Sequence, residues 1–311
     1  MTPALEIRDL VKCFGARRAL DGLSLTVPRF TVTGLVGSNG AGKTTMMMTV
    51  AGFLLPTSGS IDLLGLGAFD AEVHKGRFSV LPQDSDLPLT SRPLELLTHY
   101  GRLQGLDRAT AAHSAKEMLE AVHLGDRFDS PIRALSHGMR KRVMMAQCFI
   151  GSPELVLLDE PLSGLDPLEV AHMRAFILQR KSRQTIVISS HNLHDIEQVC
   201  DYVAFVEKGR TVRSARIGEL TGKASLLSYQ LSGAPTDIPA LMQVLPEGAT
   251  LDFNPEKCVL TCRYPAGKVE AQEVNQALVP PLLAQCGLIA VTQGNSLEDE
   301  YLKHSLRARK G

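Results

Sequence analysis

The stretch Gly37-Ser38-Asn39-Gly40-Ala41-Gly42-Lys43-Thr44-Thr45 fits the spacing G-x-x-x-x-G-K-[ST] of a phosphate-binding loop. Its glycines allow the backbone to wrap closely and to point N–H groups at an anion. Lys43 supplies positive charge for the β- and γ-phosphates of a nucleotide, and the Thr44 hydroxyl stands where a Mg²⁺ ion would be bound. Residues 37–45, called the phosphate loop below, therefore predict a nucleotide site.

The segments on both sides of the phosphate loop support this interpretation. Residues 30–36 are strand-like, and residues 45–51 can form a helix whose positive N-terminus faces the phosphates. A glycine turn without a ligand is the alternative, and this flanking strand and helix disfavour it.

Length and composition place limits on the rest of the chain. Its 311 residues indicate two domains, and a hydrophobic content of 44% indicates a globular protein with a real core. The net charge is zero, which gives no electrostatic case for binding nucleic acid. The N-terminus lacks the apolar core of a signal peptide, and no apolar run approaches the ~20 residues that span a bilayer. We therefore expect a cytoplasmic location.

Strand and helix patterns alternate along the first two thirds of the chain. Strand-like runs occur at 5–8, 23–27 and 60–64, and residues 93–124 shift to a helical period. The runs at 155–158 and 185–189 are almost wholly apolar, as in strands buried on both faces. This alternation predicts an α/β fold with a central, largely parallel sheet.

The last third has a different pattern. Its expected order is strand 226–231, helix 238–245, strand 250–253, strand 258–264, helix 269–278 and strand 288–292. The order βαββαβ is that of a ferredoxin-like domain. Ser296 can cap one more helix at 297–306. We expect domains at 1–220 and 221–311.

Two carboxylates follow the apolar run 155–158. A strand that ends in Asp159 and Glu160 places both at its C-terminal tip, where ligands bind in open α/β sheets. Asp159 can hold Mg²⁺, and Glu160 can take a proton from an attacking water. Two adjacent acids are otherwise typical of a surface turn, but a phosphate loop in the same chain disfavours that alternative.

Residues 135–142, Leu-Ser-His-Gly-Met-Arg-Lys-Arg, lead into an apolar helix. Ser136 is a natural N-cap, and a helix start with a free hydroxyl and a close-packed glycine makes a second anion site. Taken alone, this segment is better explained as an ordinary capped helix.

Together these pieces resemble the ATPase subunit of an ATP-binding-cassette (ABC) transporter over about residues 4–220. The phosphate loop, the signature segment 135–142 and the acidic strand occur in the family's order. Under this resemblance Gln83 stands at the Q-loop, Asp166 closes the D-loop, His191 is the switch histidine and Phe14 is the aromatic that stacks on adenine.

The signature segment departs from the common Leu-Ser-Gly-Gly-Gln. His137 replaces the first glycine and Met139 replaces the glutamine, while Ser136 and Gly138 remain. The variant looks like that of the exporter class whose membrane subunits are separate polypeptides.

The resemblance implies a P-loop fold with an antiparallel β subdomain, a helical insert at about 84–150 and a small α+β C-terminal domain. It assigns catalysis to Glu160, His191, Lys43 and Gln83. It assigns Mg²⁺ binding to Thr44, Gln83 and Asp159. The residues implied for ATP binding are Phe14, Gly37, Ser38, Asn39, Gly40, Ala41, Gly42, Lys43, Thr44, Thr45, Ser136, Gly138 and Asp166.

The family's architecture also implies partners. Two cassettes stack head to tail around ATP, so we expect this chain to pair with a second copy or a paralogous ATPase. An integral membrane permease would hold the pair at the inner face of the membrane. The apolar residues expected to form a groove for the permease, or else to pack inside the insert, are Leu87, Pro88, Leu89, Leu94, Leu96, Leu97 and Tyr100.

Other functions remain open at this level. A soluble cassette ATPase that acts on ribosomes or DNA is disfavoured because the chain holds one cassette, no long coiled-coil insert and no net charge. A P-loop kinase or ligase would not need the signature segment. An importer subunit is disfavoured by the signature variant. The C-terminal domain could dimerise, regulate or contact a partner.

Overall fold

The computed structural model describes residues 2–222, 225–294 and 297, and the chain divides into two compact units, 1–214 and 215–311. The boundary lies a few residues before the position 220 expected from the sequence. Each unit has a sheet of its own.

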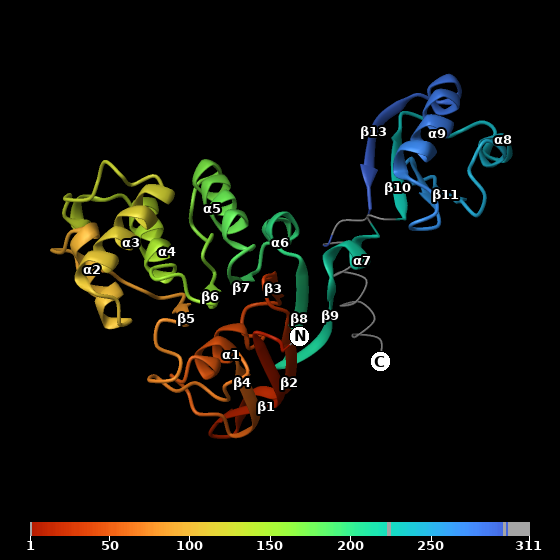
Figure 1. The fold of residues 1–311 in the computed structure, drawn as a ribbon. Coiled ribbons are helices and arrows are strands. Elements are labelled where there is room, and N and C mark those ends of the chain that lie inside the picture. The colour runs from red at the N-terminus through yellow and green to blue at the C-terminus, as the bar shows by residue number, and fades with distance from the viewer. Residues whose placement is uncertain (1, 223–224, 295–296, 298–311) are drawn as a thin grey trace. The chain divides into compact units, whose positions relative to one another are not determined.

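A six-stranded sheet organises the first unit (Figure 1). In spatial order its strands are β5 (Phe78–Leu81), β6 (Leu155–Asp159), β7 (Thr185–Ser190), β3 (Val32–Val36), β8 (Tyr202–Glu207) and β9 (Arg210–Arg216). The pairs from β5 to β8 are parallel, which confirms the predicted largely parallel sheet. Every residue of β3, β6 and β7 is buried, and this is why their sequences are mainly apolar and show no alternation of polar and apolar residues.

A three-stranded antiparallel sheet packs with the helix that follows the phosphate loop. Its order is β2 (Arg17–Val27), β1 (Leu5–Phe14), β4 (Ser58–Leu63). One hydrophobic core joins alternate residues of these strands to Met46, Met47 and Val50 of α1 (Lys43–Val50). The antiparallel β subdomain is therefore present.

The chain between β5 and β6 is helical. It contains α2 (Pro93–Leu103), α3 (Arg108–Ala121), a short 3₁₀ turn (Ile132–Ala134) and α4 (His137–Cys148). Figure 1 shows α2, α3 and α4 grouped together. The Ser136 hydroxyl accepts the N–H of Met139 at 3.1 Å, so the expected N-cap of α4 is confirmed.

The apolar residues expected to form a permease groove are not all available. Leu87, Leu96 and Leu97 are buried within the unit, whereas the Leu89 side chain is half-exposed. For the three buried residues the structure therefore favours the other alternative, packing inside the unit, while the groove stays a prediction for the exposed ones. Two further helices, α5 (Pro167–Arg180) and α6 (Leu193–Val199), follow β6 and β7.

The second unit begins with α7 (Ile217–Thr221) and has the predicted order βαββαβ. Its elements are β10 (Leu226–Leu231), α8 (Ile238–Gln243), β11 (Thr250–Asn254), β12 (Val259–Arg263), α9 (Ala271–Gln285) and β13 (Leu288–Gln293). The sheet order is β11-β12-β10-β13, and every pair is antiparallel. Its core packs Leu227 and Tyr229 of β10 against Val274 and Leu278 of α9.

The helix expected at 269–278 continues through Pro280 and Pro281 to Gln285. The helix expected at 297–306, with its cap Ser296, lies outside the described residues except for Leu297. Within the described part of the chain, no helix combines the length and the apolar character needed to cross a bilayer.

Candidate active site

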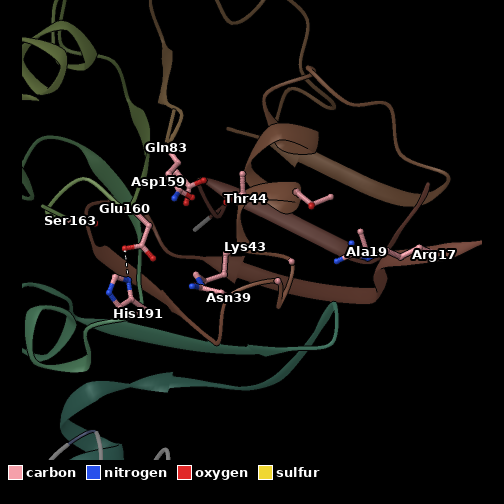
Figure 2. Close-up of a pocket in the computed structure, with 13 residues that line it drawn as sticks. Arg17, Ala19, Asn39, Lys43, Thr44, Gln83, Asp159, Glu160, Ser163 and His191 are labelled. Atoms are coloured by element: carbon pink, nitrogen blue, oxygen red, sulfur yellow. Dashed lines mark hydrogen bonds and ion pairs between the residues drawn. The ribbon is translucent and has the colours of Figure 1, made fainter. Parts of the chain in front are cut away.

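Four loops meet at one edge of the six-stranded sheet. They follow β5, β6, β7 and β3, which are neighbouring parallel strands, so their carboxyl ends lie side by side. Gln83 follows β5, Glu160 follows β6, His191 follows β7 and the phosphate loop follows β3. The cavity between them measures about 520 Å³ (Figure 2). Its lining consists of Arg17, Ala19, Asn39, Gly40, Gly42, Lys43, Thr44, Thr45, Gln83, Asp159, Glu160, Ser163 and His191.

The phosphate loop needs glycine for steric reasons. A Cβ at Gly37 would lie 2.2 Å from the carbonyl oxygen of Val206, so no other residue fits without movement of the backbone. Gly42, the N-cap of α1, has a φ of 112°, which L side chains rarely adopt. These glycines let the loop pass close to β8 and turn directly into the helix.

Lys43 lies inside this loop. Its side chain is buried, and its ammonium donates to the carbonyl oxygen of Gly37 at 2.7 Å. Burial lowers the pKa of Lys43, while the nearby charges of Glu160 and Asp159 act in the opposite direction. The cation is therefore held at the base of the cavity, facing two carboxylates.

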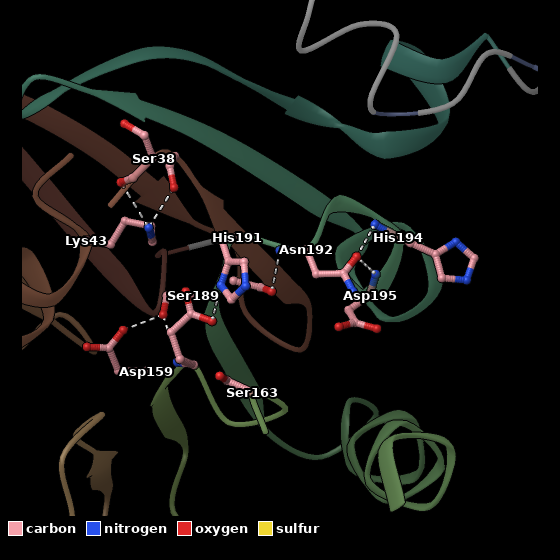
Figure 3. A network of polar contacts seen from close by, with 12 residues as sticks. Ser38, Lys43, Asp159, Ser163, Ser189, His191, Asn192, His194 and Asp195 are labelled. Carbon is pink, nitrogen blue, oxygen red and sulfur yellow. Dashed lines mark hydrogen bonds and ion pairs between the residues drawn. The ribbon is translucent and has the colours of Figure 1, made fainter. Parts of the chain in front are cut away.

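Both acids at the end of β6 form hydrogen bonds with Ser189 on β7, and Figure 3 shows the one between Ser189 and Asp159. The Ser189 hydroxyl donates to Asp159 Oδ1 and accepts the backbone N–H of Glu160 at 2.9 Å. Glu160 has a φ of 50°, in the left-handed region that costs a non-glycine residue about 1 kcal/mol or more. This unusual backbone turn directs its carboxylate away from the strand.

The turn brings Glu160 to His191. Glu160 Oε2 lies 3.0 Å from His191 Nδ1, and the carboxylate is buried while the imidazole is largely exposed (Figure 2). A carboxylate fixed in this way on the wall of the cavity can accept a proton from a bound water. Figure 2 shows this pair across the cavity from Arg17 and Ala19.

The structure places the three residues expected to bind Mg²⁺ around the same cavity. Asp159 Oδ2 is buried, and within the described residues it has no hydrogen-bond partner. The Thr44 and Gln83 side chains line the cavity with it. A hard divalent cation takes oxygen ligands, so a free carboxylate oxygen beside a hydroxyl and an amide suits it.

The remaining predicted site residues do not line the cavity. Ser136 and Gly138, at the start of α4, are absent from its wall, and Ser136 is exposed. Asp166 caps α5 by accepting the N–H of Glu169 at 2.9 Å. Phe14 is half-exposed at the end of β1, and Lys12 Nζ lies 5.1 Å from its ring centroid. Gly37, Ser38 and Ala41 belong to the phosphate loop but do not reach the cavity wall.

Sequence reasoning missed four contributors. Arg17, Ala19 and Ser163 line the cavity, and Ser189 holds the two acids. Arg17 follows the expected adenine-stacking residue Phe14 by three residues, and this proximity was a usable signal. The two residues pair in the β1–β2 register. For Ser189 there was none, because the sequence does not show that β6 and β7 are neighbours.

Comparisons with known proteins agree with this geometry. Residues 20–163 match the family described as ABC transporter. The Nod factor export ATP-binding protein I of Ralstonia nicotianae is 32% identical to this chain, and the alignment covers 97% of this chain and 94% of that protein. The chain belongs to the ABC transporter family. The energy-coupling factor transporter ATP-binding protein EcfA of Methanoculleus marisnigri is 33% identical over 80% of this chain and 92% of its own length. A solved ATP-binding subunit of an ABC transporter has a TM-score of 0.64 at 27% identity, over 71% of this chain and 92% of that chain.

As an ATP-binding subunit of an ABC transporter, this chain is an ATPase. The resemblance deduced from its motifs is thereby confirmed, and the kinase or ligase alternative is excluded. ATPase subunits of this family work with membrane permease subunits in transporter complexes.

Proposed function

We propose that this ABC transporter subunit hydrolyses ATP with Glu160 as general base and thereby powers export through a separate permease. The observation that carries the catalytic part is the Glu160–His191 pair, 3.0 Å apart, on the cavity that holds Lys43. Export is supported by the match along 97% of this chain to a relative named for Nod factor export.

Each residue has a distinct task in this proposal. Lys43 and the backbone N–H groups of the phosphate loop bind the β- and γ-phosphates. Glu160 orients the attacking water and takes its proton, and His191 keeps the carboxylate turned toward the cavity. Asp159, Thr44 and Gln83 would hold Mg²⁺, which when bound supplies positive charge to the phosphate oxygens.

We also propose that Ser136 and Gly138 serve the nucleotide of a second subunit, a copy of this chain or a paralogous ATPase. Ser136 is exposed and lies off the wall of its own chain's cavity. Asp166, which caps α5, and Phe14, at the end of β1, would complete the contacts with ATP. Homodimers with twofold symmetry are the commonest assembly of this kind.

In this proposal residues 1–220 form the nucleotide-binding domain, with a helical insert at about 84–150. The second domain is ferredoxin-like, supported by its strand order β11-β12-β10-β13 and its element order βαββαβ. Dimerisation or regulation is the role that we assign to it. The pair of subunits would lie on the cytoplasmic face of the membrane, attached through the permease.

A Glu160→Gln variant of the full chain tests the mechanism. The amide cannot take a proton, so turnover should fall by ~10²–10⁴ while ATP binding persists. With Mg-ATP the variant should sediment as a closed dimer. The matched control is Glu95→Gln on the exposed face of α2, which should behave like the wild type.

Two results would contradict this mechanism. Near-normal turnover by Glu160→Gln would remove Glu160 from the role of base. A variant that binds Mg-ATP and stays monomeric would refute the shared site.

The direction of transport needs the whole complex. After detergent extraction of the tagged chain and identification of its multispanning partner, the pair can be placed in vesicles with the ATPase outside. Export predicts ATP-dependent accumulation of substrate inside the vesicles. Substrate that leaves preloaded vesicles on addition of ATP would indicate import instead.

A further inference from the structure

The loop that joins β6 to α5 is held by a lysine from another helix. Lys141 of α4 donates its ammonium to the backbone carbonyl oxygens of Ser163 and Glu160, the latter at 3.4 Å. Lys141 is partly buried, and burial lowers its pKa, with the charge of Glu160 opposing the shift. No side-chain carboxylate receives this cation in the described part of the chain, so its contacts serve the main chain of the loop.

The position of these carbonyls matters because of the backbone at Glu160. Its φ of 50° is unfavourable for a residue with a side chain and must be stabilised by its surroundings. The carbonyl of Glu160 receives the N–H of Ser163 at 3.3 Å, and Lys141 adds a charged donor to the same turn. The backbone conformation of this turn determines where the Glu160 carboxylate contacts His191.

A second cation holds the far end of the same loop. Arg142 is buried, and its Nε lies 2.8 Å from Glu169 Oε2 in the first turn of α5. Arg142 also donates to the carbonyl oxygen of Val122 at 3.0 Å, at the end of α3. Consecutive residues of α4 therefore attach to both ends of the segment 160–169.

We propose that Lys141 is a positioning residue for Glu160, which holds the left-handed turn that aims the carboxylate at the bound nucleotide. α4 begins just after Ser136, which in the proposed dimer faces the second subunit. Through Lys141 the same helix contacts the loop that carries Glu160 of its own chain. A shift of α4 on dimer closure would then reach Glu160 through Lys141. This inference depends on the proposed role of Glu160.

Steady-state ATPase measurements on the full chain test it. Lys141→Met removes the donor with little loss of side-chain length and should lower kcat by up to ~10²-fold, the cost of a misplaced catalytic group, with KM for ATP unchanged within about 2-fold. Lys141→Arg keeps a charged donor and should recover most of kcat. The control is Lys116→Met, the same change at an exposed lysine of α3, which should leave kcat and KM as they are.

A double-mutant cycle separates positioning from a merely structural role. If Lys141 acts through Glu160, adding Lys141→Met to Glu160→Gln should change the residual rate by less than about 2-fold. A wild-type kcat in Lys141→Met, or an independent loss in the double variant, would overturn the inference. If Lys141→Met does not fold, Lys141→Gln, whose shorter side chain cannot span to both carbonyls, takes its place with the same criteria. High activity of Glu160→Gln alone would instead refute the proposed function, so the two failures are distinguishable.

Discussion

Replacing Ser189 by alanine should loosen the acidic end of β6. The hydroxyl is fully buried and serves two groups, the Asp159 carboxylate and the backbone N–H of Glu160. A buried N–H without an acceptor costs about 1–3 kcal/mol, and a lost hydrogen bond to a charged group about 1.5–3 kcal/mol. Because one oxygen makes both contacts, the two costs are not fully additive, and we expect the free energy of local opening at the end of β6 to fall by about 3 kcal/mol. This is roughly a 100-fold increase in the equilibrium constant for opening.

Hydrogen exchange of the amides in residues 155–160 measures this opening locally, so that the second unit does not contribute. The matched control is Ser190→Ala on the same strand. The Ser190 hydroxyl accepts the N–H of Asn192 at 3.0 Å. Because Asn192 is exposed, we expect Ser190→Ala to lower the free energy of local opening by about 1 kcal/mol or less. If Ser189→Ala accelerated exchange by less than about 5-fold, or no more than Ser190→Ala, the reasoning would be refuted.

Two further predictions concern the contribution of Arg17 to ATP affinity and that of Glu154 to stability at different pH values. Arg17→Ala should raise the KM for ATP about 5-fold, because Arg17 lines the cavity as an exposed cation, whereas Arg18→Ala should not, since Arg18 is paired with Asp21 at 2.7 Å. Equal effects in an ATPase assay would indicate loss of overall charge instead. Arg77, 2.6 Å from Glu154, helps to hold the pKa of that carboxyl below its usual 4.5, so the stability that wild type gains over Glu154→Gln should be present above pH 4.5 and disappear as the pH falls further. Urea midpoints measured against pH would contradict this if the difference between the two proteins stayed constant.

Elements with a strong local pattern were predicted well. β10 has the expected bounds, and Ser136 caps α4 as its hydroxyl and position suggested. The predicted end of α9 at Leu278 was wrong: proline normally stops a helix, but α9 continues to Gln285. Here Leu278 and Leu282 are fully buried on both sides of Pro280 and Pro281, and this packing keeps the chain helical where local preference would end it.

Burial in the helical insert could not be read from composition. Leu89 and Leu97 are the same residue type in neighbouring segments, yet one is half-exposed and the other is fully buried. Apolar side chains are required both for cores and for binding grooves, so the residue type alone does not separate these uses. The contacts of α2 with α3 and α4 decide it.

The sequence by itself determined the nucleotide site as a class, because the phosphate loop is contiguous and its chemistry depends on backbone and side chains within nine residues. It also determined that two acids end a buried strand. Only the tertiary structure decided what holds those acids. Ser189 reaches both acids because β7 lies beside β6, and Lys141 reaches the backbone of Glu160 because α4 lies against the following loop. Such contacts join segments that lie far apart in the chain. Strand order and helix packing bring these segments together, and no local sequence pattern encodes either.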